Sequence, residues 1–336
     1  MQRSEMLKKL FKAYQRGSDK EFRAAAKAIV ADERAKRRKT VANELEQILD
    51  QFPSELPRIS RAKTSSEDAG LLFAVREPRI DLGDLVLGPV TAGLVERLIR
   101  DFTGSNELER SGILMRYRAL FCGPSGCGKT VAAEGVAKEL GLNLLVVRFA
   151  MVIEPSLAKT AANLETALAR ARQEPMVVLF DELDMIGRSR DDVQGSPESR
   201  GALNCFLQAL DAFDGKGILI AATNFEQSLD FAVWRRFRDV IRFERPREPQ
   251  IEQLVRKHLA SVEIPRPQVE DLVRNLAGST HAEVEMVCLD VRKSCVLRKQ
   301  EVVEGQDVRE AVARRVYRQS ILQKIAKAAT ATVDRD

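Results

Sequence analysis

The 336-residue chain has few aromatic residues, few histidines and no long apolar run. Aromatic residues make up 5% of it and charged residues 31%, which is typical of a helix-rich protein and unlike an all-β sandwich. With only His258 and His281, histidine-centred metal sites and catalytic triads are nearly excluded. No stretch of about 18 apolar residues occurs, and the first residues lack the apolar core of a secretory signal. We therefore expect no membrane span and no export.

The number and spacing of the cysteines argue against two further kinds of site. There are five, an odd number, and no two have the Cys-x-x-Cys spacing. A disulfide framework and a zinc site are both disfavoured, and a reducing, cytoplasmic location is expected.

Two composition changes divide the chain. Residues 1–52 have helical spacing of apolar residues, and the first fifty contain 13 Lys and Arg against 8 Asp and Glu. We expect a basic helical module there that docks a partner. Residues 53–81 contain prolines and several serines in their first part, which predicts a linker.

From residue 82 to 246, short apolar runs alternate with amphipathic stretches. This alternation predicts an α/β domain with a doubly wound, parallel, five-stranded sheet covered on both faces. Residues 247–325 return to a helical pattern, and 326–336 are expected to form a disordered tail. The expected strands are 119–122, 144–147, 177–180, 218–221 and 240–243.

A glycine-rich stretch follows the first expected strand and fits the phosphate-loop pattern G-x-x-x-x-G-K-[ST]. Its backbone N–H groups and the next helix N-terminus would bind phosphate oxygens. Lys129 would reach the β- and γ-phosphates, and Thr130 would bind Mg²⁺. We also expect a lowered pKa for the Cys127 thiol, beside a helix N-terminus and Lys129. The predicted nucleotide-binding residues here are Gly123, Pro124, Ser125, Gly126, Cys127, Gly128, Lys129, Thr130 and Val131.

Polar side chains end two later strands. Asp181 and Glu182 follow the apolar run 177–180; Asp181 would hold Mg²⁺ and Glu182 would polarise the attacking water. Asn224 follows the next strand and would orient that water. Arg235 and Arg236 are adjacent, and their guanidinium groups suit charge on a phosphoryl group in transition.

As a set, these motifs resemble those of the AAA branch of the AAA+ ATPases, over about residues 82–320. The resemblance implies a phosphate-loop α/β domain, a C-terminal helical lid, and ATP with Mg²⁺ as ligands. It places Val86, in the segment 84–87, beside the adenine. It gives Asn224 the role of the family's sensor-1 asparagine. Arg235 and Arg236 match the arginine-finger pair that acts on ATP bound by the neighbouring subunit, which implies a ring, taken to be hexameric.

Two segments depart from the family pattern. The run 278–284 resembles the lid turn near the ribose, with His281 where glycine is usual. The run 156–160 matches the axial pore loop but reads Ser-Leu-Ala-Lys-Thr and lacks the aromatic residue that grips a threaded chain. Leu157 offers a weaker apolar contact, and residues 187–198 are a candidate second pore loop.

The basic N-terminal helices resemble those of bacterial AAA+ proteins encoded beside a subtilisin-like serine protease, some of which look like anti-phage systems. We expect an ATPase that remodels a protein partner or activates an associated effector. One alternative is a nucleic-acid-associated ATPase such as a loader, favoured by the basic helices but lacking an aromatic platform for bases. Another is a nucleotide-gated scaffold with negligible turnover, against which the Asp181–Glu182 pair argues.

Overall fold

The computed structural model describes residues 28, 34, 72–154, 156–185 and 197–333. The chain divides into two units, residues 1–67 and 68–336. Of the N-terminal module predicted for residues 1–52, only Ala28 and Arg34 are described, and both are helical. The remainder of that module and residues 53–71 of the expected linker lie outside the described residues.

The second unit contains a six-stranded sheet in the order β1-β3-β4-β5-β2-β6. The five predicted strands are confirmed, and they pair in parallel. Because parallel strands are covered on both faces, they read as continuous apolar runs, and β2 and β5 are buried along their whole length. Their bounds are β2 Arg118–Cys122, β3 Asn143–Arg148, β4 Met176–Asp181, β5 Ile218–Thr223 and β6 Asp239–Arg242.

The sixth strand was missed by the sequence analysis. Strand β1 (Phe73–Arg76) lies within the predicted linker and pairs antiparallel with β3. Only Phe73 of its four residues is buried, so the strand has almost no apolar pattern. Strand β1 is defined by its backbone pairing with β3 and not by a pattern of apolar side chains.

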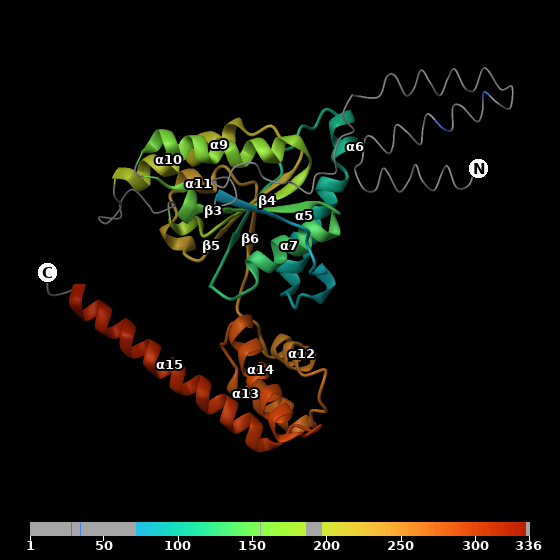
Figure 1. The fold of residues 1–336 in the computed structure, drawn as a ribbon, viewed down its shortest axis with the longest axis vertical. Helices are drawn as coiled ribbons and strands as arrows, with labels where there is room; N and C mark the ends of the chain where they lie inside the picture. Colours follow the sequence, from blue (N-terminus) through green and yellow to red (C-terminus); the bar gives the residue numbers. More distant parts are fainter. Residues whose placement is uncertain (1–27, 29–33, 35–71, 155, 186–196, 334–336) are drawn as a thin grey trace. The chain divides into compact units, whose positions relative to one another are not determined.

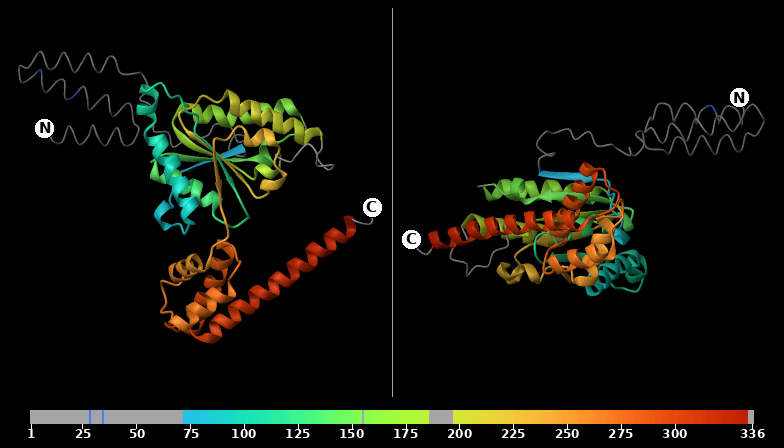
Figure 2. Two further views of the ribbon diagram at one scale, coloured as in Figure 1. Left: turned by 180° about the vertical axis from the view of Figure 1, so that it is seen from behind. Right: turned by 90° about the horizontal axis from the view of Figure 1, so that it is seen from below.

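Helices cover both faces of the sheet, and side chains that alternate along the strands feed two separate cores (Figure 1). Leu120 and Val178 face one core with helices α9 and α10, whereas Phe121 and Val177 face the other with α5 and α7. The left view in Figure 2 shows the same arrangement of sheet and helices from the opposite side. The bounds are α5 Pro89–Thr103, α6 Ser105–Arg110, α7 Lys129–Glu139, α8 Phe149–Val152, α9 Leu157–Gln173, α10 Pro197–Ala212 and α11 Phe231–Trp234.

A helical region follows the sheet and has a core of its own, to which Val255, Leu272 and Val291 contribute. Its last helix continues to Val333, so residues 326–333 are helical where a disordered tail was predicted. Alanine dominates this stretch and favours a helix, which explains the error. None of the helices in the described ranges combines the length and apolar character needed to cross a membrane. The bounds are α12 Glu248–His258, α13 Arg266–Asn275, α14 His281–Arg298 and α15 Gly305–Val333.

The register brings three strand ends together. Cys122 of β2 pairs with Thr223 of β5, and Phe180 of β4 pairs with Ala221 of β5. The segments after β2, β4 and β5 therefore leave the sheet at the same edge, where ligands bind in open parallel sheets. Three short 3₁₀ turns also belong to this unit: Leu82–Asp84, Leu183–Met185 and Glu226–Ser228.

The close approach of β4 and the start of β5 predicts a stability difference between two glycines. A Cβ on Gly217 would lie 2.2 Å from the Met176 carbonyl oxygen, whereas a Cβ on Gly93, in α5, meets nothing within 4 Å. Gly217→Ala should lower the free energy of unfolding by about 1–3 kcal/mol. Gly93→Ala should raise it by up to about 1 kcal/mol, because alanine favours the helix. Urea unfolding of both variants checks this, and equal effects would contradict the register.

Candidate active site

The phosphate loop connects β2 to α7 in a conformation that requires glycine. Gly123 has φ of 133°, and a Cβ there would lie 2.1 Å from the Phe243 carbonyl oxygen. Gly128 has φ of 93° and is the N-cap of α7. No side chain caps this helix end, so its first N–H groups remain available to an anion. The geometry fits a bound phosphate, as the sequence pattern predicts.

Lys129 is buried, with 6% of its surface exposed, and is not solvent-facing. Its Nζ donates to the Gly123 carbonyl oxygen at 2.6 Å, the Pro124 carbonyl oxygen at 2.9 Å and Asn224 Oδ1 at 2.9 Å. Burial lowers the pKa of Lys129, because the charged form loses hydration. The ammonium therefore joins the phosphate loop to the end of β5 and is held where phosphate oxygens would replace its present acceptors.

Thr130 and Asp181 form the pair expected at a magnesium site. Thr130 Oγ1 donates to Asp181 Oδ2 at 2.8 Å, and the Glu182 amide donates to Asp181 Oδ1 at 3.0 Å. Hydroxyl and carboxylate oxygens suit Mg²⁺, which commonly combines one or two carboxylates with substrate phosphates. The described residues contain no group of three or more His, Cys, Asp or Glu side chains that could hold a metal without substrate. The residues present thus fit a nucleotide-bound Mg²⁺.

Glu182 is exposed and has φ of 59°, a left-handed conformation that is unusual for a non-glycine residue. Such strain is concentrated at functional sites, where the surrounding structure maintains it. Here the amide of Glu182 is fixed by Asp181, and the following 3₁₀ turn continues from it. The side chain is left in solvent, next to the Asp181 carboxylate that bonds to Thr130, and an exposed carboxylate can polarise water.

Asp184 is a site residue that the sequence analysis missed. Its Oδ1 accepts hydrogen bonds from Thr223 Oγ1 at 3.3 Å and from the Asn224 amide at 3.1 Å. It therefore ties the segment after β4 to the end of β5 and fixes the backbone of Asn224. The available signal was a third carboxylate three positions after Asp181, in the turn that follows a strand paired with the one before Asn224.

A cavity of about 440 Å³ opens beside Gly123, Pro124 and Asn224. Glu226 and Arg242 also line it and form an ion pair at 2.7 Å. Neither residue was predicted from the sequence. The cavity leaves open space beside Asn224, where we expect its amide to orient a water molecule.

The lid turn contacts the phosphate loop directly. The Ala282 amide donates to the Gly126 carbonyl oxygen at 3.0 Å, and His281 Nε2 lies 2.9 Å from the Val86 carbonyl oxygen. Because a carbonyl only accepts, Nε2 carries the proton in this contact. Burial lowers the pKa of His281, so the ring is neutral near pH 7. His281 in place of glycine thus joins the lid to the segment predicted beside the adenine.

The structure bears on the predictions made for Cys127 and for the two candidate pore loops. The prediction of a lowered Cys127 pKa is wrong, because the thiol is 1% exposed and desolvation raises its pKa despite Lys129. The predicted pore-loop residue Leu157 begins α9 and is 44% exposed, and its role in a pore stays a prediction. Most of the candidate second pore loop, residues 187–198, lies outside the described residues.

Arg235 and Arg236 lie at the end of α11, where they do not contact the phosphate loop of their own chain. The Arg235 guanidinium is 4.7 Å from the centroid of the Phe231 ring. Arg236 donates to Asp211 Oδ2 at 3.4 Å and to the Ala232 carbonyl oxygen at 3.3 Å. The next residue, Phe237, is buried in one of the two cores of the sheet and fixes the end of this segment.

Comparison with known proteins agrees with this geometry. The family described as "ATPase family associated with various cellular activities (AAA)" matches residues 119–245. An uncharacterized AAA family ATPase, y4kL, of Sinorhizobium fredii is 35% identical over 93% of this chain and 95% of its own. The chain therefore belongs to the AAA family of ATPases, and it is an ATP-binding and ATP-hydrolysing enzyme.

More distant relatives share part of their length with this chain. ATP-dependent zinc metalloprotease FtsH 2 of Bdellovibrio bacteriovorus is 28% identical over 72% of this chain and 41% of its own. Proteasome-activating nucleotidase of Methanococcus vannielii is 25% identical over 68% of this chain and 60% of its own. The chain thus spans less than two thirds of these two proteins.

Replacement of Lys129 tests the phosphate loop. Lys129→Ala should weaken nucleotide binding by about two orders of magnitude or more, since charge-assisted hydrogen bonds contribute about 1.5–3 kcal/mol each. The nucleotide-free fold should persist, because removing a buried charge offsets the loss of its hydrogen bonds. Titration calorimetry with ADP and circular dichroism together measure both. Unchanged ADP affinity would refute the assignment.

Replacement of Glu182 tests the role of its charge. Glu182→Gln keeps the size and the hydrogen-bonding capacity but cannot polarise water as a carboxylate does. ATP binding should be retained while the turnover number falls by about two orders of magnitude or more. Steady-state phosphate release measures this, and wild-type turnover would remove Glu182 from the mechanism.

Proposed function

We propose that the chain assembles into a hexameric ring whose ATP hydrolysis remodels a protein partner or activates an associated effector. The observation that carries this proposal is the position of the two arginines. The described contacts of Arg235 and Arg236 are with Phe231, Ala232 and Asp211, and none of them is with the phosphate loop of the same chain. A guanidinium pair placed in this way can serve a nucleotide bound by a neighbouring subunit, which supports a ring.

In the proposed site, ATP is held by the loop 123–130 and by Val86 at the adenine. Thr130 and Asp181 hold Mg²⁺, which neutralises phosphate charge when bound. Glu182 polarises water and Asn224 orients it. The direct contact between lid and loop through Ala282 and Gly126 supports nucleotide-dependent lid movement as the mechanical output.

The kind of partner is proposed from the relatives. A zinc metalloprotease and a proteasome-activating nucleotidase are, by their names, connected with proteolysis. This chain covers 41% of FtsH 2, and we propose that the two share the ATPase part and that the effector is of the protease class, as the resemblance of the N-terminal helices implies. The exposed Leu157 supports a contact with a protein segment. The five free cysteines support a cytoplasmic location.

Mixing two inactive variants tests the ring. Arg235→Ala/Arg236→Ala should bind ATP normally and hydrolyse it poorly, whereas Lys129→Ala should not bind. A mixed ring can place an intact phosphate loop of the first variant against intact arginines of the second, so activity should return. ATPase rate is measured against mixing ratio, with subunit exchange followed by native mass spectrometry.

Exchange without recovered hydrolysis would show that the arginines act within their own subunit. Two additions to the assay separate the alternatives. Stimulation by DNA with a steep salt dependence would favour a nucleic-acid-associated ATPase. Tight ATP binding by the wild type without turnover would favour a scaffold.

A further inference from the structure

The turn 278–284 is the part of the lid that meets the phosphate loop. On that side, Ala282 bonds to the Gly126 carbonyl, and Arg245 Nη1 donates to the Gly278 carbonyl oxygen at 2.8 Å. A Cβ on Gly126 would lie 3.0 Å from both Ala282 Cβ and Thr280 Oγ1, so the two backbones are packed closely. A shift of this turn would therefore displace the phosphate loop.

The opposite side of the turn is held by α15, far along the chain. Arg315 donates to Ser279 Oγ at 2.6 Å through Nη2 and to the Asn275 carbonyl oxygen at 3.1 Å through Nη1. Ser279 is fully buried. One guanidinium thus fixes both the end of α13 and the first part of the turn.

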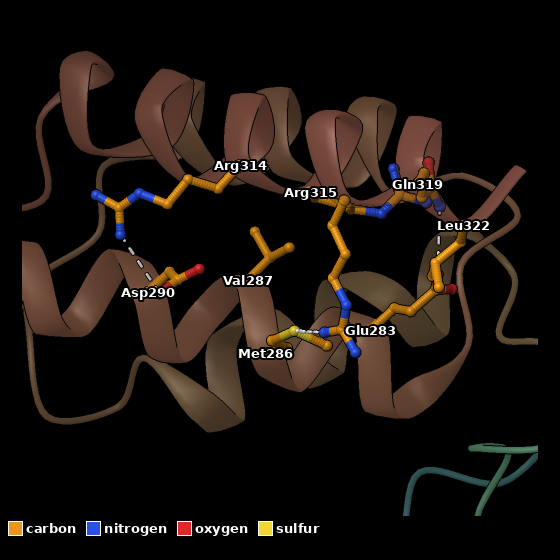
Figure 3. Close-up of a pocket in the computed structure, with 9 residues that line it drawn as sticks. Glu283, Met286, Val287, Asp290, Arg314, Arg315, Gln319 and Leu322 are labelled. Carbon is orange, nitrogen blue, oxygen red and sulfur yellow. Dashed lines mark hydrogen bonds and ion pairs between the residues drawn. The ribbon is translucent and has the colours of Figure 1, made fainter. Parts of the chain in front are cut away.

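Gln319, one helical turn further along α15, holds the second part. Its Nε2 donates to Glu283 Oε1 at 3.2 Å, the contact drawn as a dashed line in Figure 3. The other carboxylate oxygen of Glu283 accepts from the Thr280 amide at 2.8 Å and closes the capping box of α14. Burial alone would raise the pKa of Glu283, but hydrogen bonds from Thr280 and Gln319 outweigh it and lower the pKa. Glu283 is therefore an ionised acceptor held from both sides.

We propose that Arg315 and Gln319 are positioning residues that hold the turn 278–284 against the phosphate loop and so determine nucleotide affinity. Among their described contacts, none is with the phosphate loop, Glu182 or Asn224. Replacing either residue lowers the fraction of molecules in which the turn is positioned for nucleotide binding. The apparent affinity for nucleotide falls in proportion to this fraction. ATP and ADP are affected alike, because the turn does not discriminate the chemical step.

Arg314 provides a matched control. It is the adjacent residue on the same helix, carries the same charge, and forms ion pairs with Asp290 at 3.4 Å and Glu310 at 3.7 Å. Figure 3 draws a pocket between α14 and α15 and shows Arg314 directed toward Asp290, at the other end of this pocket from Gln319. Among the described contacts of Arg314, none involves the turn.

The experiment compares Arg315→Ala with Arg314→Ala in the full chain. Equilibrium binding of a fluorescent ADP and steady-state kinetics are measured for each. Arg315→Ala should raise Kd for ADP and KM for ATP about tenfold, with kcat within about twofold, which is the signature of lost uniform binding. Gln319→Ala should shift both constants in the same direction by a smaller factor, and Arg314→Ala should leave them unchanged.

A purely structural role is separated by a second variant. Ser279→Ala removes the hydroxyl acceptor of Arg315 while leaving the arginine, and it should raise Kd in the same way even if Arg315→Ala does not fold. The melting temperature of each nucleotide-free variant is recorded. Lower melting temperatures with unchanged Kd, equal Kd changes for Arg314→Ala and Arg315→Ala, or a fall in kcat with unchanged Kd would each overturn the proposal.

Discussion

The site depends on one buried ammonium group. Lys129 Nζ is held by two carbonyl oxygens of the phosphate loop and by the amide oxygen of Asn224, so it links the segments that follow β2 and β5. Burial disfavours the charge of the lysine, and these acceptors together with the nearby carboxylates of Asp181 and Asp184 stabilise it. An anion supplies better acceptors than carbonyls do. This arrangement is therefore suited to binding phosphate. When phosphate binds, the ammonium either keeps its hydrogen bond to Asn224 or exchanges it for one to a phosphate oxygen.

The sheet makes that link possible. Two apolar cores fix β2, β4 and β5 in register. The polar side chains that follow these strands are short, and the register brings them within hydrogen-bonding distance at one edge of the sheet. Asp184 then ties the segment after β4 to the end of β5, while Thr130 reaches Asp181 from the first turn of α7. The lid adds a third support, because Ala282 and His281 bond to backbone carbonyls on two different segments of the α/β domain. A displacement of any one of these segments is therefore transmitted to the loop that holds phosphate.

Sequence was most informative where chemistry demands a fixed residue pattern. Five parallel strands were predicted because strands buried on both faces are continuously apolar, and the phosphate loop because its φ angles demand glycine. Strand β1 was missed because an edge strand with one buried residue has no such pattern. Asp184 was missed because its role lies in a contact across strands. Cys127 was misjudged because its spacing from Lys129 predicted stabilisation of the thiolate, whereas burial, which sequence does not give, has the larger effect on its pKa.

The central claim is that the ends of β2, β4 and β5 form one half of an ATPase site that a second subunit completes. The most direct test is electron cryomicroscopy of the Glu182→Gln variant with ATP and Mg²⁺. The account predicts a ring with triphosphate on residues 123–130, the metal between Thr130 and Asp181, and Arg235 and Arg236 of one subunit at the γ-phosphate of the next. Nucleotide bound elsewhere, or a site closed by the arginines of its own chain, would contradict it.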